Sequence, residues 1–423
     1  MPDTHFPLPL PLPLPAPCCG GDHRLLPVAS LGALLDRVEI PGAGVETVGL
    51  GDAVGRVLAE DIVAAGDLPS RDCSAMDGYA VAFDGLEPGR PSTLPVVGRV
   101  AAGHPLDRPV RRGEAVRIFT GAALPDGCDT VVMQEHCAAA DGFVTLPPAV
   151  ARNANRRRRG EDVSAGTLCL ARGAVLRPQD IGMAAALGHA TLRVRAPVRV
   201  AVFSTGDELC EPGEPLGDGR IHDINRYTLT AMLKRLGCAV TDVGIVRDDR
   251  RSVVGTLAEA ACGHDLIVTS GGMSVGEEDH VKAAVGELGS LGFWRLAVKP
   301  GKPVAVGHVG AVPFVGLPGN PVAVMVTFAL VARPLIRRIA GAVAAEPRRW
   351  QVAADFAHDK PAGRRDYLRG RLLDGGRVAK FRHDGSHVIS SMVEADGLIE
   401  LRDETTRIEP GDRVDFLPFA ELL

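Results

Sequence analysis

The sequence predicts a multidomain protein built around an α/β domain with a parallel sheet. Strand-like and helix-like segments alternate from residue 199 to residue 288, which is typical of parallel strands joined by crossover helices. On either side of this region, short runs of Val and Ile alternate with Gly and Pro, which indicates β-rich domains. A chain of 423 residues also has room for about two to four domains.

The composition excludes several classes of protein. Hydrophobic residues make up 46% of the chain and charged residues 23%, an ordinary balance for a globular protein. The net charge of −5 gives no reason to expect nucleic-acid binding, and no run of 18 apolar residues predicts a membrane span. The nine cysteines are scattered, with no CxxC pair, so we expect a reducing, cytoplasmic location.

The N-terminal part predicts an arm followed by a linking domain. Residues 1–20 alternate Pro and Leu, and we expect a disordered, extended arm. Residues 21–60 and 155–196 are predicted to form the linking domain, with a first helix between Pro27 and Val38 capped by Ser30. A turn of amphipathic pattern follows at 50–58, and Pro178 begins another helix.

Residues 61–154 are predicted to form an inserted β-rich lobe. Its loop at 68–81 carries Asp72 and Asp77 among small residues that would let a ligand approach the backbone. Asp72 is a candidate metal ligand or general base, although both residues also suit simple Asx-turns. Thr120 lies at a strand end, where its hydroxyl and the nearby amides could face an anion.

The α/β domain, residues 197–341, has polar residues at the ends of three successive strands. These are Ser204-Thr205-Gly206-Asp207-Glu208, Asp248-Asp249 and Ser270-Gly271-Gly272. Ligands bind at the carboxyl ends of parallel strands, so we expect these segments to meet at one edge of the sheet. Glycine turns suit phosphate and carboxylates suit a hard cation, which predicts a phosphate-plus-cation site.

The stretch from Asp265 to His280 combines both features of the predicted phosphate-plus-cation site. A short apolar strand ends in the glycine turn, and the acidic turn Glu277-Glu278-Asp279 leads into a helix at Val281. The alternative is a tight strand-to-helix turn with a solvated acidic cap. The coincidence at three strand ends favours the ligand site.

Two further segments predict anion contacts, each with a plain alternative. Lys299 and Lys302 flank Pro300-Gly301 and suit an anionic substrate, or they belong to a hairpin with solvated lysines. Pro318, Gly319 and Asn320 precede a long apolar helix that we expect to run from Pro321 to Ile339, where they could meet an anion or only begin the helix.

The C-terminal residues 342–423 read as short alternating strands and predict a separate β domain. Within it, Gly385-Ser386-His387 is predicted to form a turn. His387 has no Cys or His at metal-ligand spacing, so we interpret it as a surface or core histidine. The four arginines 156–159 are interpreted as a solvated run that pairs with the adjacent Glu161 and Asp162.

Seven motifs in order now resemble one family. They are SAMDGYAV (74–81), RIFTGAALPDGCDTVVMQE (117–135), RRGEDVSAG (158–166), STGDEL (204–209), SGGMSVGEEDH (270–280), KPGKP (299–303) and GLPGNPV (316–322). The chain from about residue 27 to its C-terminus resembles the bacterial MoeA family of molybdopterin molybdenumtransferases, which is related to the insertase domain of gephyrin.

The resemblance implies a four-domain, elongated chain with a barrel-like C-terminal domain. It implies a transferase of molybdenum cofactor biosynthesis that inserts molybdenum from molybdate into adenylylated molybdopterin, releases AMP and uses Mg²⁺. It further implies a homodimer whose active site lies between the α/β domain of one subunit and the lobe of the other. Transient contact with the molybdopterin adenylyltransferase and with molybdoenzyme chaperones would follow from such a role.

The motifs carry the family's functional residues onto this chain. The implied catalytic residues are Asp72, Thr120, Asp162, Glu208, Asp248, Asp279 and Lys299. Glu208, Asp248 and Asp279 would hold the metal. The implied substrate contacts are Ser204, Thr205, Gly206, Asp207, Ser270, Gly271, Gly272, Lys302, Pro318, Gly319 and Asn320. The chain departs from the family at Arg295, where relatives often carry Lys, and at Met273, where they often carry a smaller residue.

Two other functions are considered beside this one. The molybdopterin adenylyltransferase shares the SGG-type turn, but it is a single α/β domain without extra β domains. A non-catalytic molybdopterin-binding scaffold is the alternative from another class, and it would have no need of the full acidic set.

Overall fold

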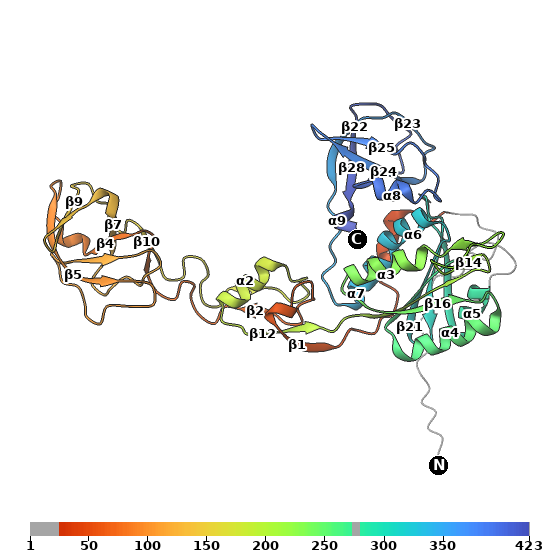
Figure 1. Cartoon of the computed structure of the whole chain (residues 1–423), viewed down its shortest axis with the longest axis horizontal. Helices are drawn as coiled ribbons and strands as arrows, with labels where there is room; N and C mark the ends of the chain where they lie inside the picture. Colours follow the sequence, from red (N-terminus) through yellow and green to blue (C-terminus); the bar gives the residue numbers. More distant parts are fainter. Residues whose placement is uncertain (1–24, 273–279, 423) are drawn as a thin grey trace, which may run out of the picture.

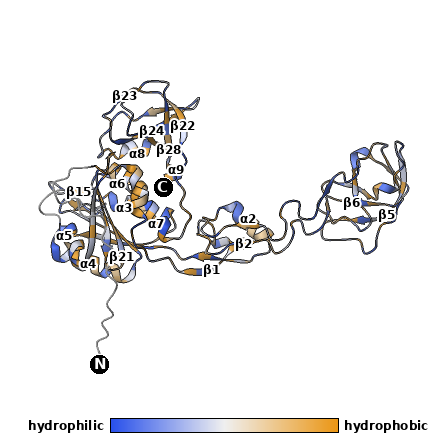
Figure 2. Cartoon of the chain, turned by 180° about the vertical axis from the view of Figure 1, so that it is seen from behind, coloured by the Kyte–Doolittle hydropathy of each residue, from blue (hydrophilic) through white to orange (hydrophobic). Residues whose placement is uncertain are grey.

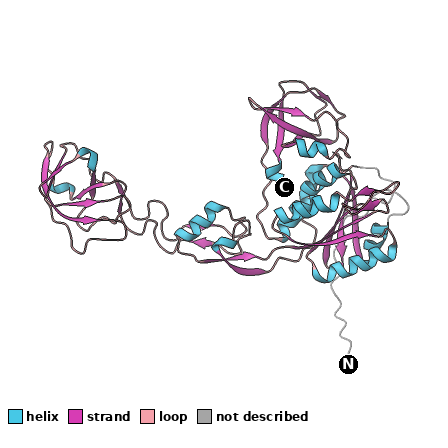
Figure 3. Cartoon of the chain, in the orientation of Figure 1, coloured by secondary structure: helices cyan, strands magenta, loops and turns pink. Residues whose placement is uncertain are grey.

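The protein is an elongated chain of four parts (Figure 1). The structure is a computed structural model that describes residues 25–272 and 280–422. The lobe lies at one end, the linking domain in the middle, and the α/β and C-terminal domains together at the other end. Figure 3 shows helices gathered mainly in the α/β domain, whereas the lobe and the C-terminal domain consist mostly of strands.

The lobe is organised on a six-stranded sheet of order β7-β4-β6-β5-β9-β8. Its strands are β4 Gly78–Val81, β5 Ser92–Val100, β6 Ala115–Ile118, β7 Thr130–Met133, β8 Ala138–Ala140 and β9 Phe143–Leu146. Val81, Val116, Val131 and Val144 are fully buried. The β-branched runs therefore form the interior, as their pattern predicts.

The linking domain is a small unit made of two distant stretches of the chain. Strand β1 (Val45–Gly49) pairs antiparallel with β12 (Thr191–Arg195), and β2 (Ile62–Val63) pairs with β11 (Leu168–Leu170). Helix α2 (Pro178–Ala186) begins at the predicted proline, and the Asp180 carboxylate accepts a hydrogen bond from the Arg177 amide. A core around Leu58 and Val194 joins the two stretches.

Two local predictions in this part can be compared with the structure. The turn expected at 50–58 is present as a short 3₁₀ turn, Leu50–Asp52, and Gly55 then adopts a positive φ of 77°. The first helix is shorter than expected: the 3₁₀ turn Val28–Ser30 leads into α1, Leu31–Leu35. Ser30 has helical backbone angles and makes no side-chain capping bond, since the chain is already wound there.

The α/β domain has a six-stranded sheet of order β16-β13-β17-β21-β20-β18. The three strands β13 (Arg199–Thr205), β16 (Ala239–Val246) and β17 (Leu266–Ser270) are parallel, as predicted, and β21 (Val312–Leu317) adds a fourth parallel strand that was not predicted. Strands β20 (Pro303–Val309) and β18 (Gly289–Arg295) extend the sheet antiparallel, which the alternation of elements did not predict.

Helices cover both faces of this sheet. Helix α3 (Asn225–Arg235) packs with α1 and the helices after Pro321 around Val200, Val202 and Val268. Helices α4 (Arg250–Gly263) and α5 (His280–Leu288) pack on the other face around Phe203 and Ile267. Seen from behind, α4 and α5 show hydrophilic as well as hydrophobic residues, as amphipathic helices do (Figure 2).

The helical segment that begins at Pro321 runs to Ile339, as predicted, but it is not uniform. Helix α6 (Pro321–Thr327) passes through a π-helical stretch, Phe328–Ala332, into α7 (Arg333–Ile339). Pro334 lacks the amide hydrogen that an α-helix would need, and π-bulges are one way to accommodate such a break.

The C-terminal domain is a closed barrel. Its strands are β22 (Trp350–Ala354), β24 (Arg365–Leu373), β25 (Arg377–Lys380), β26 (Gly397–Leu401) and β28 (Arg413–Pro418). The order β24-β25-β22-β28-β26 closes because β24 also pairs with β26. Short elements complete it: β23 (His358–Asp359), β27 (Arg407–Ile408), α8 (Ser390–Glu394) and α9 (Phe419–Leu422).

A strand of the α/β domain joins the barrel directly. Strand β19 (Val298–Lys299) pairs in parallel with the start of β24, with Lys299 opposite Asp366. The amide of Val322 in α6 also donates to the Ser386 carbonyl of the barrel, at 3.0 Å. Backbone hydrogen bonds next to Lys299 therefore hold the two domains together.

Candidate active site

The predicted strand ends meet at one edge of the α/β sheet. Strand β13 lies between β16 and β17, so its end at Thr205 is flanked by Val246 and Ser270. A cavity of about 870 Å³, here called the strand-end cavity, opens at this edge and against the barrel. Its lining includes Thr205, Gly206, Glu208, Asp248, Gly271, Gly272, Lys299, Lys302, Pro318, Gly319, Asn320, Arg364, Asp384 and Ser386.

The two aspartates after β16 have different surroundings. The Asp249 carboxylate caps α4, since it accepts bonds from the Ser252 amide at 2.9 Å and hydroxyl at 2.7 Å. Those bonds lower the pKa of Asp249 below its ordinary value. Asp248 lines the cavity and accepts a long hydrogen bond, 3.3 Å, from the Thr205 hydroxyl. Asp248 is therefore the residue available to a ligand.

Glu208 approaches the same edge from the end of β13. Its carboxylate lies over Gly206, where an added Cβ would stand 2.7 Å from Oε2. The Glu208 carbonyl accepts from the Ile221 amide at 2.8 Å, which anchors the loop that follows. Of the neighbouring predicted residues, Asp207 is exposed and Ser204 is buried, and neither lines the cavity.

The glycine turn after β17 allows a close approach that no side chain could make. Gly271 has a φ of 93°, and a Cβ there would lie 2.5 Å from the Thr205 carbonyl oxygen. Gly272 has a φ of 62°, and its Cβ would meet Val281 at 2.6 Å. These two residues need glycine both for the backbone angle and for space.

The cationic side of the cavity comes from the β19–β20 turn. Lys299 is half-buried and Lys302 is exposed, and both line the cavity. Within residues 25–272 and 280–422, neither lysine lies within ion-pair distance of a carboxylate. Two lysines in a cavity without such partners suit an anionic ligand.

The barrel contributes residues that sequence reasoning missed. Arg364 lines the cavity and donates to Asp366, a fully buried carboxylate, at 2.8 Å. Asp384 pairs with Lys380 at 2.8 Å; burial raises the pKa of Asp384, but the bond and charge of Lys380 outweigh it and lower the pKa overall. The nearby Gly385-Ser386 turn was predicted as a turn, but nothing in its sequence marked it as part of a site.

Three predicted catalytic residues lie elsewhere in the same chain. Asp72 is paired with the Arg156 guanidinium and accepts from the Arg159 amide at 2.8 Å. Thr120 is fixed by Asp77, which accepts from its amide and its hydroxyl, each at 2.8 Å. Asp162 is exposed, in the segment between the lobe and the linking domain. Figure 1 shows the lobe at the opposite end of the molecule from the α/β domain.

These contacts also show how the lobe loop and the nearby arginines are held. Asp77 is a structural acceptor for Thr120, and the Thr120 amide and hydroxyl lower the pKa of Asp77. Arg157, Arg158 and Arg159 are exposed, as a solvated run predicts, but the acidic partners of Arg156 and Arg159 are Asp72 and Asp67. Glu161 accepts a hydrogen bond from the Arg158 backbone amide at 2.7 Å.

Glu208 and Asp248 have the chemistry of a partial metal site. Glu208 and Asp248 supply the hard oxygen donors that Mg²⁺ prefers, and Mg²⁺ commonly binds through one or two carboxylates together with substrate phosphates. In the described part of the chain, no group of three His, Cys, Asp or Glu residues could hold a metal. The third predicted ligand, Asp279, and Met273 lie outside the described residues. The two carboxylates present fit a cation that a bound phosphate helps to hold.

Fold and cavity together define the class of this protein: a multidomain protein whose α/β domain has a cavity at its strand ends that suits an anionic ligand, with residues of a β-barrel lining one side. Three family models match along the chain. They are the MoeA N-terminal region (domain I and II) at residues 27–188, a probable molybdopterin binding domain at 201–338 and the MoeA C-terminal region (domain IV) at 351–419.

Whole-chain relatives agree with these matches. The chain is 39% identical to the molybdopterin molybdenumtransferase of Haemophilus influenzae, covering 92% of this chain and 97% of the relative. It is 36% identical to molybdopterin molybdenumtransferase 2 of Mycobacterium tuberculosis, covering 87% and 93%. The crystal structure of the molybdopterin biosynthesis MoeA protein of Pyrococcus horikoshii superposes with a TM-score of 0.81 at 28% identity, covering 93% and 100%. The chain belongs to the MoeA family.

Proposed function

We infer that this protein is a molybdopterin molybdenumtransferase, a transferase of molybdenum cofactor biosynthesis. The support is the shared name of relatives that align over nearly their whole length. A probable molybdopterin binding domain spans the residues that form most of the strand-end cavity. Molybdopterin and molybdate are accordingly its substrates.

For the reaction itself, we propose that molybdenum enters adenylylated molybdopterin and AMP is released. The observation that supports this best is the arrangement of charge in the strand-end cavity. Glu208 and Asp248 stand at the strand ends, whereas Lys299 and Lys302 come from the β19–β20 turn. The barrel adds Arg364 and Asp384, and the Asp384 carboxylate is already paired with Lys380. In this proposal the Gly271–Gly272 turn receives a phosphate through its amides, and Lys299 balances the charge of molybdate.

We propose Mg²⁺ as the metal. Glu208 and Asp248 would hold it, with Asp279 as the third residue from outside the described chain. Bound there, Mg²⁺ would supply charge neutralisation at the pyrophosphate link, which makes AMP a better leaving group. The carboxylates themselves repel molybdate and phosphate, so their role is to hold the cation.

The active site is proposed to form between two copies of the chain. Asp72, Thr120 and Asp162 belong to the lobe end of the molecule, remote from the strand-end cavity of the same chain (Figure 1). A homodimer that brings the lobe of one copy to the cavity of the other would unite the two sets. Asp72 would then position water or metal, as its fixed carboxylate allows.

The cellular setting is proposed from the same role. We expect a cytoplasmic enzyme in transient contact with the molybdopterin adenylyltransferase and with molybdoenzyme chaperones. Among the described residues, no helix has the length and apolar character needed to cross a membrane.

The deciding experiment measures AMP release from adenylylated molybdopterin by the purified protein at fixed Mg²⁺, with and without molybdate. Molybdate-dependent release is the expected result. Tight substrate binding without AMP release would favour the scaffold instead. ATP consumption with molybdopterin would favour the adenylyltransferase.

A further inference from the structure

Asn225 joins two turns of the strand-end cavity without lining the cavity itself. It is the first residue of α3, and its Nδ2 donates to the Ser270 hydroxyl oxygen at 2.9 Å and to the Gly319 carbonyl at 2.7 Å. Ser270 ends β17, and Gly319 follows β21, the neighbouring strand. The Asn225 side chain therefore bridges the glycine turn 270–272 and the turn 318–320.

The orientation of the Asn225 amide is fixed by its partners. The Ser270 hydroxyl donates to the Pro318 carbonyl at 3.0 Å, so its oxygen accepts from Asn225. The Gly319 carbonyl can only accept. Turning the amide around would place its oxygen against two acceptors, so Nδ2 must face the turns. The Asn225 Oδ1 atom is left buried without a hydrogen-bond partner in the described part of the chain.

Among the described residues, few hydrogen bonds join the two turns beyond the end of the sheet. The ladder between β17 and β21 ends at the pair Ser270–Leu317, and the next backbone bond, from the Gly271 amide to the Leu317 carbonyl, is long at 3.3 Å. Past this point, the connections within the described part of the chain are the Asn225 side chain and the Ser270–Pro318 bond. Gly271, Gly272, Pro318 and Gly319 all line the cavity, so their spacing determines its width.

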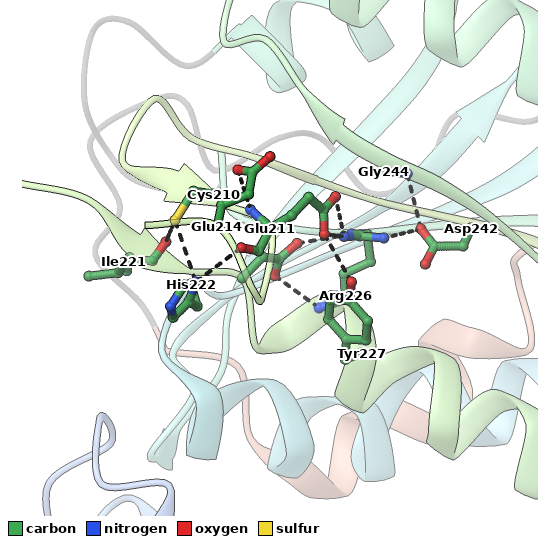
Figure 4. Close-up of polar contacts among 10 residues, drawn as sticks. Cys210, Glu211, Glu214, Ile221, His222, Arg226, Tyr227, Asp242 and Gly244 are labelled. Carbon is green, nitrogen blue, oxygen red and sulfur yellow. Dashed lines mark hydrogen bonds and ion pairs between the residues drawn. The ribbon is translucent and has the colours of Figure 1, made fainter. Parts of the chain in front are cut away.

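The first turn of α3 is a firm anchor for this bridge (Figure 4). The Arg226 guanidinium is 4% exposed and binds Asp223, Asp242 and both carboxylate oxygens of Glu211. The Asp223 carboxylate also accepts from the Arg226 amide at 3.2 Å, and the Asp223 amide donates to the Cys210 carbonyl. The helix start is thus tied to β16 and to the loop that begins at Glu208.

We propose that Asn225 is a positioning residue that sets the separation of the turns 270–272 and 318–320, so that their backbones hold the anionic part of the substrate. The identity of that substrate rests on the proposed function. The positioning role itself does not, because the hydrogen bonds of Asn225 lie within the protein.

The test compares Asn225→Asp with Asn225→Ala. The aspartate is nearly isosteric but sets an acceptor against the Gly319 carbonyl, whereas alanine only removes the bridge. Thr228→Val is the matched control, since it removes one hydrogen bond of the same helix turn, from Thr228 to the Ile224 carbonyl, without touching either turn. Amide hydrogen exchange of segments 266–272 and 316–320 is measured in the free protein, which needs no substrate.

We expect exchange in both segments to be about tenfold faster in Asn225→Asp, less so in Asn225→Ala and unchanged in Thr228→Val, since one lost hydrogen bond is worth about that factor. With adenylylated molybdopterin as the probe, KM should rise by roughly tenfold while kcat changes less, because the turns hold ground and transition states alike.

Three outcomes decide the matter. Unchanged exchange in Asn225→Asp would overturn the positioning role, whatever the activity. A larger effect for alanine than for aspartate would also overturn it, since that order indicates a packing role. If exchange is faster in Asn225→Asp but the wild-type protein releases no AMP, the proposed function is refuted. The positioning role of Asn225 would still hold in that case.

Discussion

At the scale of single residues, the hydrogen bonds and ion pairs of each charged side chain decide how available it is to a ligand in the strand-end cavity. Asp249 is committed to capping α4, whereas its neighbour Asp248 meets only one long bond from Thr205. Lys299 lies in the cavity with no carboxylate at ion-pair distance among the described residues, whereas Arg364 is held by Asp366. Adjacent or chemically similar residues thus have different capacities for a ligand.

Lys299 provides the first prediction. Lys299→Gln should lower kcat/KM for molybdate in AMP release by roughly 100-fold, the usual effect of removing one preorganised electrostatic contact. The measurement is steady-state AMP release over a molybdate titration. Lys234→Gln, an exposed lysine in the last turn of α3, is the control and should behave as wild type. Equal loss in both variants would contradict a specific role for Lys299.

Gly271 provides the second prediction. Gly271→Ala should destabilise the α/β domain by about 1 to 3 kcal/mol, because a positive φ and a contact with the Thr205 carbonyl are forced on the new side chain. Chemical denaturation followed by far-UV circular dichroism measures the change. Gly255→Ala is the matched control within α4, where an added Cβ meets nothing within 4 Å, and it should be neutral or stabilising. A neutral Gly271→Ala would show that the turn relaxes freely.

At the scale of elements, the barrel depends on a buried charged network around Glu400 in β26. Glu400 is 3% exposed and accepts from Arg349 at 2.6 Å and from Arg365 and Tyr367 at 3.0 Å each. Burial alone would raise the pKa of Glu400, but the bonds and charges of Arg349 and Arg365 lower the pKa below its ordinary 4.5.

Glu400 therefore links barrel stability to pH. A carboxyl with a lowered folded-state pKa contributes stability above its unfolded pKa, about 4.5, and loses it as pH falls through the folded value. Glu400→Gln should lower the free energy of unfolding at pH 7 by about 1 to 3 kcal/mol, because the partly exposed Arg349 and Arg365 lose their hydrogen bonds to a buried carboxylate. The variant should also lose less stability than wild type as the pH falls below about 5, where the carboxyl of Glu400 takes up a proton.

Thermal unfolding at a series of pH values measures both effects. Glu394→Gln, an exposed residue of α8, is the control and should leave the pH profile unchanged. If the thermal stability of Glu400→Gln falls as steeply with decreasing pH as that of wild type, the pH dependence belongs to other carboxyl groups.

At the scale of the whole molecule, the elongated shape separates two sets of predicted site residues. The lobe carries Asp72 and Thr120, and the other end of the chain carries Glu208, Asp248 and Lys299 (Figure 1). In the proposed dimer, the lobe of one copy meets the cavity of the other, and a closed two-fold pair would form two such composite sites.

Complementation between inactive copies tests this assembly. A purified heterodimer of an Asp72→Asn copy and a Lys299→Gln copy should recover about half of wild-type AMP release, because one of its two composite sites is intact. Pairing Lys299→Gln with Asp248→Asn is the control, since both changes lie on the same domain and no intact site can form. Equal activity of the two heterodimers would argue against a site shared between copies.

The sequence by itself determined the α/β domain, the order of its strand ends and most of the residues around the cavity. It could do so because these are local properties: apolar periodicity defines strands and helices, and the rule for parallel sheets brings successive strand ends to one edge. The helix start at Pro178 and the turn at Gly271 follow from local chemistry in the same way.

Only the tertiary structure decided which residues from distant parts of the chain complete the site. Arg364 and Ser386 reach the cavity because β19 of the α/β domain pairs with β24 of the barrel, a contact that no local pattern encodes. Asn225 acquires its role because α3 starts beside two turns that are 45 and 94 residues away in sequence. Such long-range contacts depend on how whole elements pack, and periodicity and turn chemistry describe only the elements themselves.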